Sequence, residues 1–78
     1  MLLEIITPES KLFTGEITSI KLPGMDGEFE ILNNHAPIIS TLSKGVIRII
    51  DNDNNTEKFE VNGGVIEMQN NKIIVLAD

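Results

Sequence analysis

The chain has 78 residues, which is enough for one small domain, and a domain of this size buries only about two thirds of the surface that its unfolded chain exposes. Such a thin core argues against a deep catalytic cleft. Twelve acidic residues against six basic ones give a net charge of -6, which repels nucleic acid and anionic lipid. There is no cysteine, so disulfides and thiolate metal sites are excluded. We expect one domain over residues 1–78.

The composition favours strands over helices. The chain contains thirteen Ile, four Val and five Thr but only two Ala, and β-branched residues suit the pleated surface of a sheet. No apolar run approaches the roughly 18 residues of a membrane-spanning helix, and the start of the chain lacks a basic segment followed by a long apolar one. The sequence therefore predicts an all-β domain without direct insertion into a membrane.

Short runs of apolar or alternating residues, cut by turn residues, follow one another along the chain. Strands are expected at residues 2–6, 12–22, 28–32, 37–42, 46–50, 57–61, 65–68 and 72–77. Turns separate them at intervals of roughly eight to twelve residues, a spacing typical of a flattened β-sandwich or barrel of about eight to ten short strands.

Period-two alternation predicts which side chains face the core. In the second strand, Thr18, Ile20 and Leu22 are expected on one face and Ile17 on the other, and Pro23-Gly24 is expected to end the strand. The predicted core consists of Phe13, Ile20, Leu22, Ile47, Ile49, Phe59, Val61 and Val75.

The last strand is apolar on both faces. Ile73 and Val75 lie on one face, and Ile74 and Leu76 lie on the other. A sheet with one solvated face does not explain this pattern. Two alternatives remain open: both faces are internal to the sandwich, or a partner covers one of them.

The most distinctive segment is LPGMDGEFEILNNHAP, residues 22–37. Two glycines border a tight turn that presents three acidic residues, Asp26, Glu28 and Glu30, and the chain's one histidine follows at the next corner. Many such loops only connect strands. Here the acidic turn is interpreted as a contact surface.

Catalytic constellations are absent from the sequence. With one histidine and no cysteine, neither a zinc site at His35 nor a serine or cysteine nucleophile has the partners that it needs. The stretch Asp51 to Glu57 is similar to a calcium loop, but Thr56 stands where an EF-hand requires glycine, so it is interpreted as a solvated hairpin tip. We expect a protein without cofactor or metal that is not itself an enzyme.

Five segments in order resemble one known domain. They are LEIITPE, TGEITSIKLPG, DGEFEILNNHAPI, KGVIRI and VNGGVIEMQNNKIIVLAD. Each segment alone is a weak signal, but the ordered set is specific. Together they cover almost the whole chain and resemble the amino-terminal β-domain of the epsilon subunit of F-type ATP synthases.

The resemblance implies a rotor subunit at the foot of the central stalk, on the cytoplasmic face of the bacterial inner membrane. Such a subunit links the gamma subunit to the membrane c-ring and so couples proton or sodium flow to ATP synthesis in the catalytic head. Carried over by position, the expected c-ring contacts are Asp26, Gly27, Glu28 and Glu30. The expected gamma contacts are His35, Ala36, Pro37, Ile38, Ile39 and Ser40.

The sequence departs from the family in two places. Glu30 and Asn33-Asn34 stand where the family commonly has Gly and Pro-Gly, which puts the path of this loop in question. The sequence ends at Asp78, where most members continue into a two-helix hairpin that restrains ATP hydrolysis, so we expect no such inhibition from these residues. Two other classes remain open: a non-rotary β-sandwich interaction module and a small enzyme.

Overall fold

The computed structural model describes residues 1–78, which form eight strands and no helix. The strands are β1 (Leu2–Ile6), β2 (Lys11–Gly24), β3 (Gly27–Leu32), β4 (Ile38–Leu42), β5 (Gly45–Asp51), β6 (Thr56–Val61), β7 (Gly64–Gln69) and β8 (Lys72–Ala77). The predicted all-β fold is confirmed, and the strand bounds differ from the expected ones by no more than two residues. The turn residues located the strand ends closely, because the sequence places its strand-breaking residues where the chain reverses.

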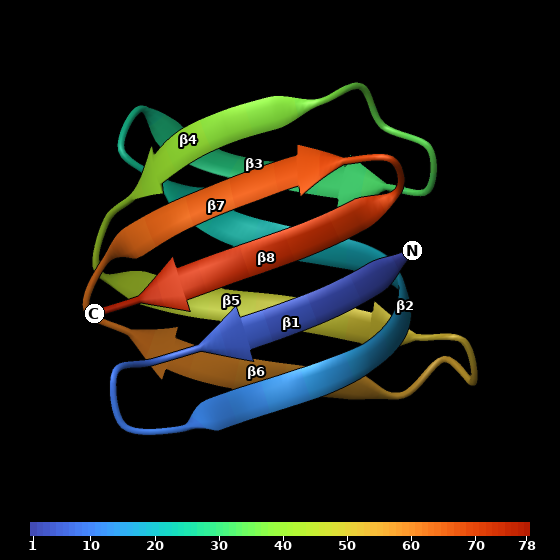
Figure 1. The fold of residues 1–78 in the computed structure, drawn as a ribbon, viewed down its shortest axis with the longest axis horizontal. Coiled ribbons are helices and arrows are strands. Elements are labelled where there is room, and N and C mark those ends of the chain that lie inside the picture. The colour runs from blue at the N-terminus through green and yellow to red at the C-terminus, as the bar shows by residue number, and fades with distance from the viewer.

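The strands form two layers, and β2 belongs to both (Figure 1). One layer has the order β4, β7, β8, β1, and its β1 pairs with the first half of β2 from Lys11 to Glu16. The second half of β2 lies in the other layer between β3 and β5, and β6 follows β5. In Figure 1, β2 curves around the end of the sandwich from the front layer to the back. The structure is therefore the flattened sandwich expected from the sequence.

A β-bulge in β2 corrects one sequence expectation. Against β5, Ile17 pairs with Asp51 but Ser19 pairs with Ile50, so Thr18 is an extra residue, and its hydroxyl donates to the Ile50 carbonyl at 3.2 Å. An extra residue reverses the alternation of side chains. Ile17 is therefore fully buried together with Ile20, and its predicted place on the opposite face is wrong.

The second correction concerns the end of β2, which continues through Pro23-Gly24. Pro23 has no N–H to donate, but its carbonyl still accepts a hydrogen bond from the Ser43 N–H at 2.8 Å. Proline therefore does not end the strand, because strand pairing here uses its carbonyl and needs no N–H from it. Gly24 is required by close approach, because a Cβ there would lie 2.6 Å from the Gly27 carbonyl oxygen. Gly27 follows the two-residue turn with φ of 125°, a conformation suited to glycine.

The core lies between the layers and contains 16 buried apolar residues. Six of the eight predicted core residues are buried, namely Ile20, Leu22, Ile47, Ile49, Val61 and Val75. Phe13 and Phe59 are half-buried instead and meet edge to face with ring centroids 6.0 Å apart. Both pack against the core as expected, but they stay partly exposed, and Phe59 lies on the outermost strand, β6.

Replacing Ile20 by Ala should lower the free energy of unfolding by about 2–5 kcal/mol, because the side chain is fully buried and its loss leaves a cavity. Ile39→Ala is the matched control, since that side chain is 73% exposed, and it should change the stability by no more than about 0.5 kcal/mol. Urea unfolding followed by circular dichroism measures both. Equal effects for the two variants would contradict this description of the core.

Candidate functional site

The two surfaces singled out from the sequence lie at opposite ends of β3 and β4. The turn of Met25 and Asp26 joins β2 to β3 at one end, and the corner of His35, Ala36 and Pro37 joins β3 to β4 at the other (Figure 1). All five residues are exposed. The structure therefore places the acidic turn and the histidine corner apart, with β4 running from the second toward the first.

The turn is brought instead against the later part of β4. The Met25 N–H donates to the Thr41 carbonyl at 3.1 Å. Between the turn and the strand lies an open groove of about 660 Å³, lined by residues 24–29 and 39–41. It contains three of the expected c-ring contacts and two of the expected gamma contacts. Sequence reasoning did not find this groove because it depends on pairing between segments that are distant along the chain.

Two exposed apolar side chains border the groove from opposite walls. Met25 is 64% exposed on the turn and Ile39 is 73% exposed on β4. Asp26, next to Met25 on the turn, is exposed and takes part in no ion pair. The groove thus combines exposed apolar side chains with a carboxylate beside them, and protein interfaces have an apolar centre with a polar rim.

The remaining expected gamma contacts occupy different environments. Ile38 packs against the core and Ser40 is half-buried, because both point inward, while Ile39 between them points outward. At the corner, Nδ1 of His35 lies 2.7 Å from the Ala36 carbonyl oxygen. Of the six, His35, Ala36, Pro37 and Ile39 are exposed.

Asparagine shapes the corner between β3 and β4, where the sequence was expected to depart from the family that it resembles. Asn34 has φ of 62°, a left-handed conformation that asparagine tolerates. Its N–H donates to Oδ1 of Asn71 at 2.8 Å, and Oδ1 of Asn33 accepts from the amino terminus at 2.7 Å. The turn is therefore held by hydrogen bonds to the amino terminus and to the β7–β8 turn.

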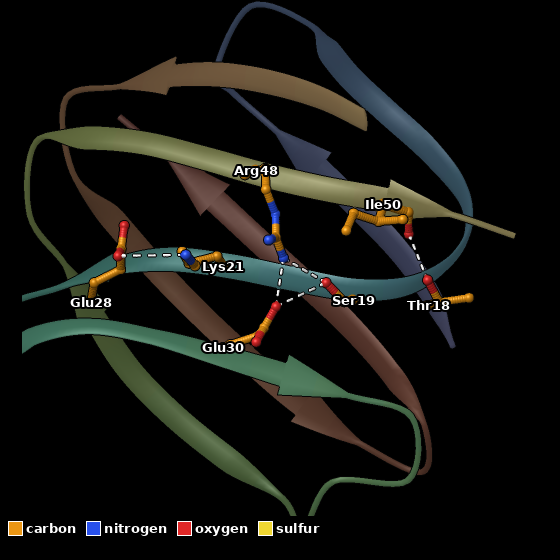
Figure 2. A network of polar contacts seen from close by, with 7 residues as sticks. All are labelled: Thr18, Ser19, Lys21, Glu28, Glu30, Arg48 and Ile50. Carbon is orange, nitrogen blue, oxygen red and sulfur yellow. Dashed lines mark hydrogen bonds and ion pairs between the residues drawn. The ribbon is translucent and has the colours of Figure 1, made fainter. Parts of the chain in front are cut away.

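A polar network crosses the outer face of the back layer (Figure 2). Nη2 of Arg48 on β5 donates to Ser19 Oγ on β2 and to Glu30 Oε2 on β3, both at 2.6 Å, and Ser19 Oγ donates to Glu30 at 3.1 Å. These bonds from Arg48 and then from Ser19 lower the pKa of Glu30 below its ordinary value. Glu30, an expected c-ring contact, is thus also part of the connection between three strands.

The sequence predicted only one feature of this network, the outward direction of Arg48. Arg48 lies between Ile47 and Ile49 in an alternating strand, which predicts an outward side chain. Its partners depend on the register of β2 with two neighbours, and the bulge at Thr18 sets that register. The charged pair was therefore not predictable from local pattern.

Other charged side chains are also paired on the surface. Glu4 lies 3.1 Å from Lys11 Nζ and 3.8 Å from Lys72 Nζ, and the hydrogen bond from Lys11 is the main cause that lowers the pKa of Glu4. Backbone N–H groups of Asn55 and Asp53 donate to Asp51 and lower its pKa at the hairpin tip. No three His, Asp or Glu side chains come together as metal ligands. These contacts stabilise turns and strand pairs.

The outer face of the front layer presents an apolar patch. Leu76 on β8 is flanked by Val65 on β7 and by Ile6 on β1. Two residues further along the strands, Glu67 on β7 is flanked by Ile39 on β4 and by Ile74 on β8. Leu76 is 55% exposed, so the alternative that both faces of the last strand are internal is wrong. A second, exposed apolar face remains beside the groove, and Ile39 belongs to both.

These features describe a β-sandwich whose exposed groove and apolar face suit protein contacts. The family ATP synthase, delta/epsilon chain, β-sandwich domain matches residues 1–78, and the chain belongs to that family. The resemblance proposed from the sequence is thereby confirmed. No helix of the structure is long and apolar enough to cross a membrane.

Curated relatives include the ATP synthase epsilon chains of Chlorobium limicola, 40% identical, and Campylobacter curvus, 41% identical, each over 76 residues or 97% of this chain. The match covers 86% of the Chlorobium protein but 59% of the Campylobacter protein. The chain therefore spans most of one relative and less than two thirds of the other.

Two solved structures have the same fold. A chain in the mitochondrial ATP synthase of Euglena gracilis, solved with its c-ring, superposes with a TM-score of 0.92 at 14% identity over 99% of this chain and 49% of that one. A chain in the central stalk and c-ring of the Tetrahymena thermophila mitochondrial enzyme gives 0.82 at 17% identity, over 99% and 62%. At such low identity the likeness establishes the fold.

The Arg48 network makes stability depend on pH in a defined direction. Because the folded-state pKa of Glu30 is below its ordinary value of 4.5, its carboxylate stabilises the folded chain above that pH, and this stabilisation is lost as the pH falls through the lower value. Glu30→Gln should therefore be less stable than the parent at pH 7, and the difference should shrink below pH ~4.5.

Urea unfolding of the parent and of Glu30→Gln at a series of pH values measures this difference. Glu67→Gln is the control, because Glu67 is exposed and has no ion pair. A gap between parent and Glu30→Gln that stays constant from pH 7 to pH 3 would disprove a stabilising role for the carboxylate.

Proposed function

We propose that this chain is a rotor subunit of the ATP synthase central stalk, where it links the gamma subunit to the membrane c-ring. In this role it transmits the torque between ion flow through the ring and ATP synthesis in the catalytic head. The observation that carries the proposal is the family match over residues 1–78. The structural relatives from ATP synthases with c-rings support it.

The c-ring contact is assigned to the acidic segment, with Asp26, Gly27, Glu28 and Glu30. Asp26, Gly27 and Glu28 are exposed on and beside the turn. Glu28 is held only loosely by Lys21, whose Nζ lies 3.9 Å away, so its charge is available to a partner. Charge complementarity of this kind sets orientation and association rate.

The gamma contact is assigned to the corner and to β4, with His35, Ala36, Pro37, Ile38, Ile39 and Ser40. Ile39 is the strongest candidate among them, because it is the most exposed large apolar side chain of the molecule. Ile38 and Ser40 point inward and support the strand from beneath. An interface that transmits torque should bury more than about 1,200 Å² in total.

The chain is proposed to catalyse nothing itself and to work as a mechanical and structural subunit. Its charged side chains form pairs between strands rather than a convergent polar site. On this account it is a peripheral component of the complex on the cytoplasmic face of the bacterial inner membrane.

Glu28→Lys should weaken assembly on the c-ring and leave the fold intact, because the side chain is 62% exposed and reversing its charge turns attraction for a basic partner group into repulsion. The measurement is co-sedimentation with the purified ring at low and high ionic strength. Glu57→Lys, an exposed site far along the chain on β6, is the control. If association with the ring changes neither with the charge reversal at Glu28 nor with ionic strength, the assignment of Glu28 to the ring contact is wrong.

Ile39→Asp should weaken binding to the purified gamma subunit, since it places a charge in an apolar contact. The effect is measured by calorimetry, with circular dichroism to establish that the variant is folded. Val46→Asp is the control, because Val46 is an exposed apolar residue on β5. Gamma binding that is unchanged in the folded Ile39→Asp variant would contradict the assignment of this face.

A further inference from the structure

β4 is an edge strand with an open side. All five of its residues pair with β7, from Ile38 opposite Met68 to Leu42 opposite Gly64. On its other side it pairs with β2 at a single position, Gly24 opposite Leu42. Most of that side is therefore left without a neighbouring strand.

The hydrogen bonds around Gly24 show which main-chain groups face the open side. The Thr41 carbonyl accepts from the Met25 N–H, so it points away from β7. In a strand, the N–H and C=O of one residue point to the same side, and every second residue repeats that direction. The N–H and C=O of Ile39 therefore also point away from β7, into the groove, where no strand pairs with β4 at this position.

The opposite wall of the groove is the start of β3, which pairs only with β2 and so has a free edge. Glu28 on β3 pairs with Pro23, which has no N–H and whose carbonyl bonds to Ser43. This pair therefore exchanges no hydrogen bonds, and the main-chain groups of Glu28 point away from β2. The groove thus lies between two free edges, β4 and the start of β3.

Exposed sheet edges bind extended segments by strand addition, and main-chain hydrogen bonds then supply affinity while alternate side chains supply specificity. Both requirements are present here. Ile39 offers unpaired main-chain groups together with an exposed apolar side chain, and Asp26 places an unpaired carboxylate on the rim.

We propose that one extended segment of the gamma subunit adds to the open edge of β4 and fills this groove. The inference rests on the proposed function and specifies its binding mode. The segment carries an apolar side chain beside Ile39 and a lysine or arginine toward Asp26, because an acidic rim selects a basic partner. Asp26, which is also assigned to the c-ring contact, then contacts both partners and lies where the two proposed interfaces adjoin.

The test compares amide hydrogen exchange, residue by residue, in the free chain and in its complex with purified gamma. In the free chain the amide of Ile39 should exchange rapidly, whereas that of Ser40, which points toward β7, should be protected. Binding of gamma should slow exchange at Ile39 by at least about tenfold, because a new hydrogen bond closes the edge.

A pair of variants separates the main-chain contact from the side-chain contact. Ile39→Ala removes the side chain and keeps the N–H, while Ile39→Pro also removes the N–H that points into the groove. Ile39→Pro should bind gamma about tenfold more weakly than Ile39→Ala, the effect of one main-chain hydrogen bond. Circular dichroism tests whether both variants are folded. If Ile39→Pro does not fold, the hydrogen-exchange experiment on the parent chain still tests the strand addition.

Two results would overturn the inference. One contradicts only the strand addition, and the other contradicts the proposed function as well. If gamma binds while the Ile39 amide exchanges as fast in the complex as in the free chain, strand addition is wrong and the proposed docking stands. If gamma does not bind the parent chain at all, the proposed function and the strand addition fail together.

Discussion

The structure depends on the passage of β2 through both layers. A 78-residue chain without cysteine has only packing to stabilise it, and this strand of 14 residues supplies buried side chains from one layer to the other. The bulge at Thr18 allows this because it turns Ile17 into the same core as Ile20. Without it, one of these side chains would face solvent.

The same strand determines where the functional surface lies. β2 leads through Pro23-Gly24 into the tight turn, and the hydrogen bonds from Met25 to Thr41 and from Ser43 to Pro23 bring that turn against β4. The groove is thus a consequence of how β2 ends. On the outer face, Arg48 binds Ser19 of β2 and Glu30 of β3, which stabilises the position of β3 behind the turn.

Local pattern was sufficient for the strands and for six of the 16 buried core residues, because turn residues and period-two alternation are properties of neighbouring positions. It failed where distant segments interact. The burial of Ile17 required the bulge, the partners of Arg48 required the strand register, and the groove required the pairing of Gly24 with Leu42. The expected contact residues came from family resemblance, and the sequence did not indicate that turn and strand share a groove.

The most direct test of the rotor role measures coupling in membrane vesicles that contain the host ATP synthase. Vesicles depleted of this chain should hydrolyse ATP but build little membrane potential, followed with a potential-sensitive dye. Adding back the purified chain should restore the ATP-driven potential, because torque then passes from gamma to the ring. An ATP-driven potential of equal size with and without the chain would contradict the account.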